Sequence, residues 1–154
     1  MIPKIKVLGD RAYQLTESWR ILWKHEGSWH KITIPEGFIC DGNSVPWFGR
    51  PLIPGDWTLG VEAVLVHDFL YHRQGRLEDG EHLVEVEKNI WVDPLSIGDG
   101  FRRAWRRRDA DKLFARLMRD AGVSQKRRRA AYRAVRLAFW NGWDEYPWYP
   151  AEDE

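Results

Sequence analysis

Three side chains that could take part in acid–base chemistry stand close together in the otherwise apolar stretch 61–71. His67 and Asp68 are adjacent, and Tyr71 follows a few residues later. An imidazole can accept a proton near neutral pH, and a carboxylate can orient an imidazole or bind a metal ion. Burying such groups is costly unless each has a partner or a chemical role. The stretch therefore holds either a catalytic site or a satisfied core histidine beside an exposed aspartate.

The spacing of the apolar residues predicts that this stretch is a helix. Thr58 is expected to cap its amino end, and the helix should continue to about Arg73. His67 and Asp68 would project about 100° apart and could border one cleft, with Tyr71 one turn further on. The apolar face would consist of Val61, Val64, Leu65, Phe69 and Leu70.

A further carboxylate lies on the apolar stripe of a second predicted helix. Asp111 precedes Phe114 by three residues and Met118 by seven, so it shares their face rather than the solvated one. Asp111 could accept a hydrogen bond from His67 on an antiparallel neighbouring helix. It could equally pair with one of the many nearby arginines, and the sequence favours neither partner.

The loop between the predicted strands and the first helix could contribute ligands to a Ca²⁺ ion. Gly42 and Asn43 tolerate positive φ, so carbonyl groups of this loop could turn inward. Inward carbonyls together with the carboxylate of Asp68 are typical oxygen ligands of Ca²⁺. The alternative is an ordinary turn stabilised by the Asp or Asn side chain. Zinc is less favoured, because the cysteine and histidines lack the paired close spacing of common zinc sites.

The net charge of +1 conceals a strongly basic segment. Residues 102–136 hold fourteen Lys or Arg and three Asp, a net charge of +11, whereas residues 1–101 and the tail from 137 each carry −5. Such a segment is most often a solvated surface, but its density here indicates an anionic partner: phospholipid, nucleic acid or an acidic protein. The expected anion-binding face includes Arg102, Arg103, Arg106, Arg107, Arg127 and Arg128.

Length and composition predict one globular α+β domain over residues 1–154. Hydrophobic residues make up 44% and charged residues 31%, which suits a chain with a real core. Cys40 is the single cysteine, so no internal disulfide can form and a reducing compartment is expected. The N-terminal residues lack the apolar core of a signal peptide, and no apolar run reaches the roughly 20 residues of a membrane span.

The predicted order is a small antiparallel sheet followed by helices, with an antiparallel helix pair and a third helix at the end. Strands alternate in polarity, the Glu26–Ser28 segment is a turn, and 82–92 is either a strand or an irregular lid. The expected elements are strands 4–8, 12–23 and 29–40, a Gly/Pro-rich loop 41–57, helices 58–73, 100–121 and 124–140, and an aromatic, acidic tail 143–154. Asp99 and Ser124 are the expected caps of the second and third helices.

Three blocks in this order resemble an uncharacterised domain family that is common in bacteriophage and prophage genomes. The blocks are Asp41-Gly-Asn-Ser-Val-Pro46, His67-Asp-Phe-Leu-Tyr71 and Ala110-Asp-Lys-Leu-Phe114. The resemblance covers roughly residues 30–140. It implies a phage or prophage source without a settled activity.

The same blocks also resemble the phospholipase A2 superfamily, in particular the lipase domain of parvovirus capsid proteins. This resemblance implies that His67 is the general base, Asp68 a calcium ligand, and Asp111 the carboxylate that orients His67. Tyr71 would donate a hydrogen bond to that carboxylate, and residues 40–43 would supply loop carbonyls. Two features depart from the superfamily: the chain cannot form the disulfides of the secreted enzymes, and the loop holds one glycine and an acidic residue.

Three functional hypotheses follow. The first is a phage-encoded, calcium-dependent hydrolase of phospholipids or other esters. The second is a non-catalytic virion or assembly protein that contacts other phage structural proteins, with the same polar residues as a structural network. The third is a basic helical module that binds nucleic acid. The expected location is the host cytoplasm, with possible incorporation into the virion. The enzyme hypothesis requires an open cleft, whereas the structural hypothesis predicts a buried network.

Overall fold

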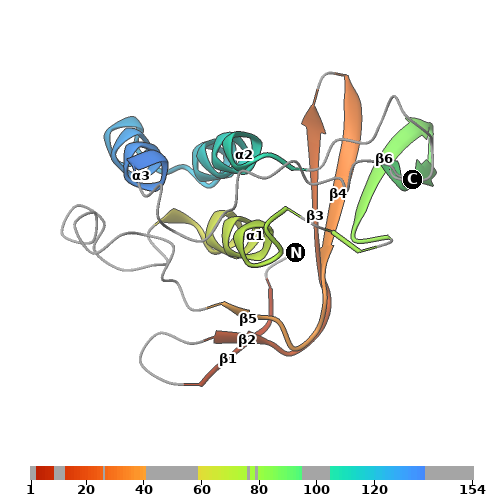
Figure 1. Ribbon diagram of the computed structural model, residues 1–154, viewed down its shortest axis with the longest axis horizontal. Helices are drawn as coiled ribbons and strands as arrows, with labels where there is room; N and C mark the ends of the chain where they lie inside the picture. Colours follow the sequence, from red (N-terminus) through yellow and green to blue (C-terminus); the bar gives the residue numbers. More distant parts are fainter. Residues whose placement is uncertain are drawn as a thin grey trace, which may run out of the picture.

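The computed structural model describes residues 3–8, 13–25, 27–40, 59–75, 77–78, 80–94 and 105–137, and it confirms the α+β class. Figure 1 shows the helices beside a four-stranded sheet, with a smaller three-stranded sheet below them. The elements are β1 (Ile5–Val7), β2 (Tyr13–Leu15), β3 (Trp19–His25), β4 (Ser28–Ile34), β5 (Ile39–Cys40), α1 (Val61–His72), β6 (His82–Glu87), β7 (Ile90–Val92), α2 (Arg107–Asp120) and α3 (Gln125–Leu137).

Two of the predicted strands are each divided between the two sheets. The segment 12–23 forms β2 in the small sheet and β3 in the large one, and the segment 29–40 forms β4 and β5. The second break falls at Pro35, which has no backbone N–H to donate, and at Gly37, whose φ is +83°. Alternation continues across the first break, because Leu15 and Trp19 are both buried. Because buried and exposed residues keep alternating across the break, the sequence pattern could not show where the chain passes from one sheet to the other.

The large sheet is antiparallel, in the order β3-β4-β6-β7. The predicted hairpin between β3 and β4 is confirmed: His25 pairs with Ser28, and Gly27 between them has φ +93°. The segment 82–92 is a β-hairpin rather than an irregular lid, with Asn89 at positive φ in its turn. The strands of this hairpin extend the sheet beside β4.

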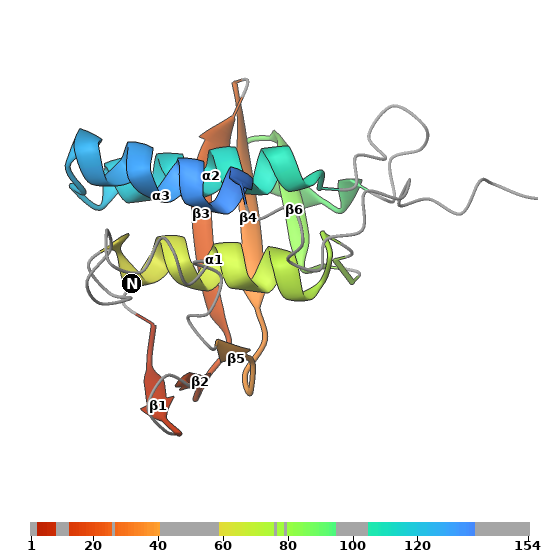
Figure 2. The same cartoon turned by 60° about the vertical axis from the view of Figure 1, so that its left-hand side comes forward.

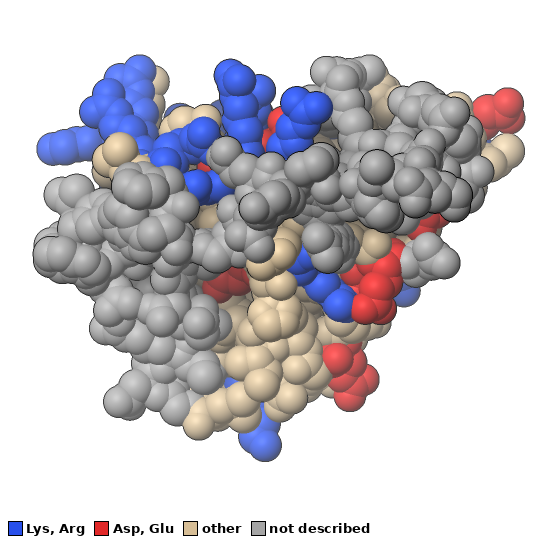
Figure 3. Space-filling model, viewed as in Figure 1, with Lys and Arg blue, Asp and Glu red and all other residues tan. Residues whose placement is uncertain are grey.

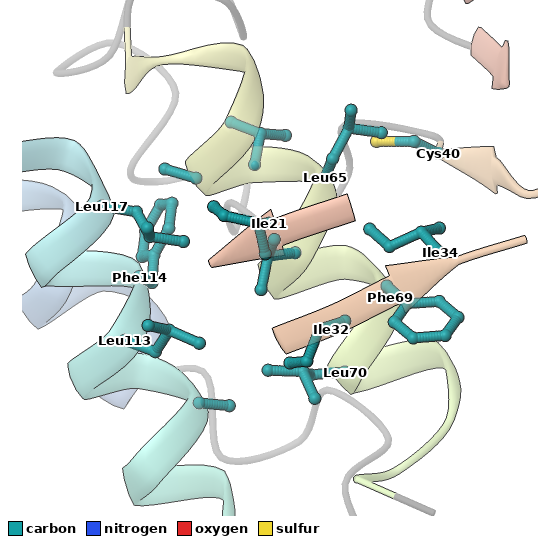
Figure 4. Close-up of a cluster of buried hydrophobic side chains, with 14 of the residues drawn as sticks. Ile21, Ile32, Ile34, Cys40, Leu65, Phe69, Leu70, Leu113, Phe114 and Leu117 are labelled. Carbon is teal, nitrogen blue, oxygen red and sulfur yellow. The ribbon is translucent and has the colours of Figure 1, made fainter. Parts of the chain in front are cut away.

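Helix α1 is the central element of the core. Its residues Ala63 to Leu70 are all buried, so the helix is enclosed on nearly every side rather than along one stripe. In Figure 2, α1 and α2 run across one face of the large sheet. Figure 4 shows side chains from α1, α2 and the strands meeting in this core, and further buried residues of α3 belong to the same cluster.

The predicted carboxyl ends of α1 and α2 are correct, and their predicted amino ends are wrong. Helix α1 begins after Gly60, and Thr58, its expected cap, lies outside the described residues. Helix α2 begins at Arg107 and not near Gly100, because Arg106 is extended with ψ 148°. The Asp99 cap lies outside the described residues.

The end of α2 follows the sequence closely. Gly122 has φ +78°, and the N–H groups of Gly122 and Val123 donate to the carbonyls of Arg119 and Met118. This is the Schellman arrangement that a glycine after a helix predicts. Ser124 directly precedes α3, and its carbonyl accepts from the N–H of Arg128. The predicted last turn of α3, residues 138–140, and the loop and tail at 41–57 and 143–154 lie outside the described residues.

The antiparallel helix pair is confirmed. Gly60 before α1 lies against Ala121 at the end of α2, and Tyr71 near the end of α1 contacts Arg107 at the start of α2. Among the described residues, no helix combines the length and the apolar composition that a bilayer crossing requires.

Candidate active site

His67 and Asp111 meet across the interface between α1 and α2. Nε2 of His67 lies 3.0 Å from Oδ1 of Asp111, and the Tyr71 hydroxyl donates to the same oxygen over 2.6 Å. His67 and Tyr71 are four residues apart, so they project from one face of α1 toward α2. The geometry therefore brings together the three residues that the sequence proposed as catalytic.

The two partners that the sequence offered for Asp111 are both present. While Oδ1 faces His67, Oδ2 accepts a hydrogen bond of 3.0 Å from Arg136 of α3. Asp111 itself is completely buried. Burial alone would raise the pKa of Asp111, but the hydrogen bonds from His67, Tyr71 and Arg136 lower it below its ordinary value. Asp111 is thus held as a carboxylate that can only accept hydrogen bonds.

The charge on Asp111 fixes the direction of the neighbouring hydrogen bonds. Because the carboxylate only accepts, Nε2 of His67 must carry a proton, and in the neutral imidazole Nδ1 therefore keeps its lone pair. Within the described part of the chain, Nδ1 has no hydrogen-bond partner. Burial, followed by the charge of Asp111, raises the pKa of Tyr71 above its ordinary value, so the phenol stays protonated and donates.

Arg107 was predicted to lie on the anion-binding face, and this prediction is wrong. Its side chain is only 6% exposed, since it turns inward toward α1 and α3. One guanidinium N–H donates to the Val135 carbonyl over 2.6 Å, and Nε donates to the Tyr71 oxygen over 3.1 Å. Arginine has no acceptor, so Tyr71 must direct its own proton to Asp111. Arg107 and Arg136 therefore complete a network that the sequence prediction did not include.

Aromatic side chains enclose the imidazole of His67. The ring centroid of Tyr71 lies 4.2 Å away and that of Phe114 lies 4.5 Å away. His67 is 1% exposed and Asp111 is 0% exposed. His67 and Asp111 thus lie in the core, while Tyr71 and Arg136 are partly exposed.

The proposed calcium ligands are described only in part. Asp68 is 6% exposed, and its Oδ2 accepts a hydrogen bond from the buried Cys40 thiol over 2.8 Å. A carboxylate suits Ca²⁺, whereas a thiol is a soft ligand, so Cys40 could contribute only through its backbone carbonyl. Asp41, Gly42 and Asn43 lie outside the described residues. Where the chain is described, no three His, Cys, Asp or Glu side chains converge as metal ligands.

Most of the described basic residues of the segment 105–136 lie on the surfaces of α2 and α3. Figure 3 shows Lys and Arg side chains gathered over these helices. Arg106 and Arg127 are exposed and Arg128 is half-buried, while Arg102 and Arg103 lie outside the described residues. We call the following set the basic helix face: Arg106, Arg108, Lys112, Arg119, Lys126, Arg127, Arg129 and Arg133, all exposed.

A second histidine pair was not predicted. Nδ1 of His30 on β4 lies 3.1 Å from Nε2 of His82 on β6, and both rings pack against Trp23. Trp105, just before α2, also packs against His82. Burial, and secondly the neighbouring His30, lower the pKa of His82 to about 4. The pair therefore belongs to the packing between the sheet and the start of α2, with the imidazole of His82 neutral.

Comparison with known proteins gives a family and no activity. The family described as "Protein of unknown function (DUF1353)" matches residues 13–135. The chain therefore belongs to this family, and the match begins at β2 and ends within α3. No curated protein and no solved structure gives a significant match.

Proposed function

We propose that this protein is a hydrolase of phospholipids or related carboxylic esters that uses His67 as a general base. The observation that carries the proposal is the pairing of Nε2 of His67 with the ionised Asp111 at 3.0 Å. This pairing leaves Nδ1 with a lone pair that could accept a proton from water. The activated water would then attack the ester carbonyl, the acyl C–O bond would break, and the His67 imidazolium would return its proton to the leaving alkoxide, giving a carboxylate and an alcohol.

The other residues of the network would keep His67 in the orientation that a general base requires. Asp111 would orient the imidazole and stabilise the imidazolium that forms after proton transfer. Tyr71 and Arg136 would hold the carboxylate in place from two sides. Arg107 would fix the Tyr71 hydroxyl, since it donates to the phenolic oxygen.

Calcium is proposed as the cofactor. Asp68 would provide a carboxylate ligand next to His67, together with backbone carbonyls of residues 40–43. Bound there, Ca²⁺ would supply electrostatic stabilisation for negative charge on the ester carbonyl oxygen. A phage or prophage source and a phospholipid substrate presented at an anionic surface are part of the same proposal, with the basic helix face as the docking surface.

The test is an ester hydrolysis assay on phospholipid micelles and vesicles, with and without Ca²⁺. His67→Ala should lower turnover by about 10²- to 10⁴-fold, the usual contribution of a general base. His72→Ala is the matched control, because His72 is an exposed imidazole on the same helix. Absence of turnover in the wild-type protein at every calcium concentration, or equal turnover in both variants, would refute the proposal.

The second candidate is a non-catalytic phage virion or assembly protein. The observation that favours it is the burial of His67 and Asp111, which are 1% and 0% exposed. In that role the network would join α1, α2 and α3 through buried hydrogen bonds. A wild-type protein that has no hydrolase activity but copurifies with phage particles would support this alternative.

A further inference from the structure

The face of the large sheet that points away from the helices carries an unusual combination of side chains. Along β3, Trp19, Ile21 and Trp23 are buried against the helices, so the alternate residues point outward. The strand register places outward residues of β4, β6 and β7 on the same face. We call the following set the outer sheet face: Arg20, Leu22, Lys24, Trp29, Lys31, Leu83 and Trp91.

Large apolar side chains are exposed on this face. Leu22 is 52% exposed and Trp29 is 43% exposed. A single exposed apolar residue is ordinary, but here two lie on adjacent strands of one sheet. Tryptophan offers a flat ring on which another ring can stack.

Lysine side chains alternate with the apolar side chains on this face, instead of forming a rim around them. Lys24 pairs directly with Trp29 across the strands, and Leu22 pairs with Lys31. Directly opposite residues in an antiparallel pair have their Cβ atoms about 5 Å apart. Nζ of Lys31 also lies 4.6 Å from the ring centroid of Trp91. Glu85, an acid at an outward position of β6, accepts a hydrogen bond from the Asn89 N–H.

This pattern indicates what kind of partner fits. A bilayer interior would require the cations to leave the centre of the apolar surface. A ligand that presents rings and negative charges in short alternation would satisfy both kinds of side chain. Unpaired nucleotides do so, because their bases stack on aromatic side chains while their phosphates pair with Lys and Arg. In a duplex the bases are already stacked, and this face would find only phosphates.

We propose that the outer sheet face binds single-stranded nucleic acid, with Trp29 as a stacking platform and Arg20, Lys24 and Lys31 as phosphate contacts. This site is separate from the His67 network, because α1 and α2 lie on the opposite face of the sheet (Figure 2). It is also separate from the basic helix face. The proposal does not depend on hydrolase activity.

The test measures binding of a fluorescent oligothymidylate of about 20 nucleotides by the full chain. Trp29→Ala should weaken binding roughly 10- to 100-fold, as expected for loss of one stacked base, and Trp29→Phe should retain most of it. Lys24→Gln should weaken binding and reduce its dependence on salt. Thermal unfolding of each variant controls for folding, and since Trp29 is partly exposed the variants should remain folded.

Three results would overturn the proposal. The first is equal affinity for a duplex of the same length. The second is loss of binding in an Arg127→Gln, Arg129→Gln, Arg133→Gln variant, with no change in Trp29→Ala, which would place the nucleic acid on the basic helix face. The third is that Trp29→Ala changes affinity for vesicles containing anionic phospholipid and leaves oligonucleotide affinity unchanged.

Discussion

Gly60 and Ala121 are in contact where the start of α1 packs against the end of α2. A Cβ atom added at Gly60 would lie 2.7 Å from Cβ of Ala121, and Gly60 has φ +88°. Both the close approach and the backbone conformation therefore require glycine. This contact sets how closely the two helices approach, and so it helps to bring His67 to Asp111.

Gly60→Ala should destabilise the protein by about 2 to 4 kcal/mol, because it combines backbone strain with a steric overlap. Chemical denaturation would measure this change. Gly122→Ala is the control, since Gly122 also has positive φ but nothing lies within 4 Å of an added Cβ. The loss should be smaller when Gly60→Ala is combined with Ala121→Gly. Equal losses in both backgrounds would contradict the contact.

Asp111→Asn should destabilise the protein by about 2 to 4 kcal/mol, because it removes a buried charge on which three donors converge. Asp120→Asn serves as a control on the same helix, since Asp120 is exposed and its pairs with arginine should contribute at most about 1 kcal/mol. Urea denaturation compares the two variants. If Asp111→Asn were no more destabilising than Asp120→Asn, the buried network would not contribute to stability.

The position of His67 opposite Asp111 could be predicted because both signals are local. Each residue lies on the apolar face of its own helix, and helical periodicity places it there. The spacing of Arg107 also indicates a buried position, because Arg107 precedes Asp111 by one helical turn. The sequence does not distinguish it from the other basic residues among the fourteen in this segment, most of which are exposed. Arg136 reaches Asp111 from another helix, and no local spacing indicates such a contact.

The arrangement of the strands was harder to predict than the helices. His30 and His82 are far apart in the sequence and meet only through the register of β4 and β6. The segments 12–23 and 29–40 each pass from one sheet to the other, and the alternation of buried and exposed residues does not change where they do so. Register and sheet order depend on long-range pairing, which a single sequence shows weakly.

The His82 environment predicts a loss of stability in mild acid. Burial, and secondly the neighbouring His30, lower the pKa of His82 from 6.5 to about 4, while the charge of Asp93 acts in the opposite direction. Below pH 6.5 the unfolded chain binds a proton that the folded protein excludes, so stability falls as the pH decreases from 6.5 to 4. The loss should amount to roughly 3 kcal/mol over this range. Its measurement is denaturant unfolding at a series of pH values.

His82→Gln should flatten this pH dependence, because the variant has no imidazole to protonate at that position. Replacement of the exposed His72 by Gln is the control and should leave the pH dependence intact. A His82→Gln protein with the same slope as the wild type would show that another group is responsible.

The basic helix face predicts binding to anionic surfaces that depends steeply on salt. Vesicles containing anionic phospholipid, DNA and acidic proteins are the three probes, and binding should weaken as salt screens the charges. Replacing Arg127, Arg129 and Arg133 by Gln should reduce both the affinity and its salt dependence. Replacing Lys4, Lys6 and Lys88 by Gln removes the same charge elsewhere and should have a smaller effect on vesicle binding. Binding that does not change with salt would contradict an electrostatic surface.

Calcium binding provides the sharpest test of Asp68. A carboxylate beside the candidate base, and a preceding segment whose backbone carbonyls could turn toward it, together suit a hard divalent cation. Calorimetry should therefore detect Ca²⁺ binding to the wild-type protein and a large loss of affinity in Asp68→Asn. Glu62→Gln is the matched control, because Glu62 is an acidic residue in the first turn of the same helix. Cys40→Ala should retain binding, since the thiol is a poor calcium ligand and only the backbone carbonyl of this residue is needed. Unchanged binding in Asp68→Asn would place the ion elsewhere, and no binding to the wild-type protein would remove calcium from the proposed mechanism.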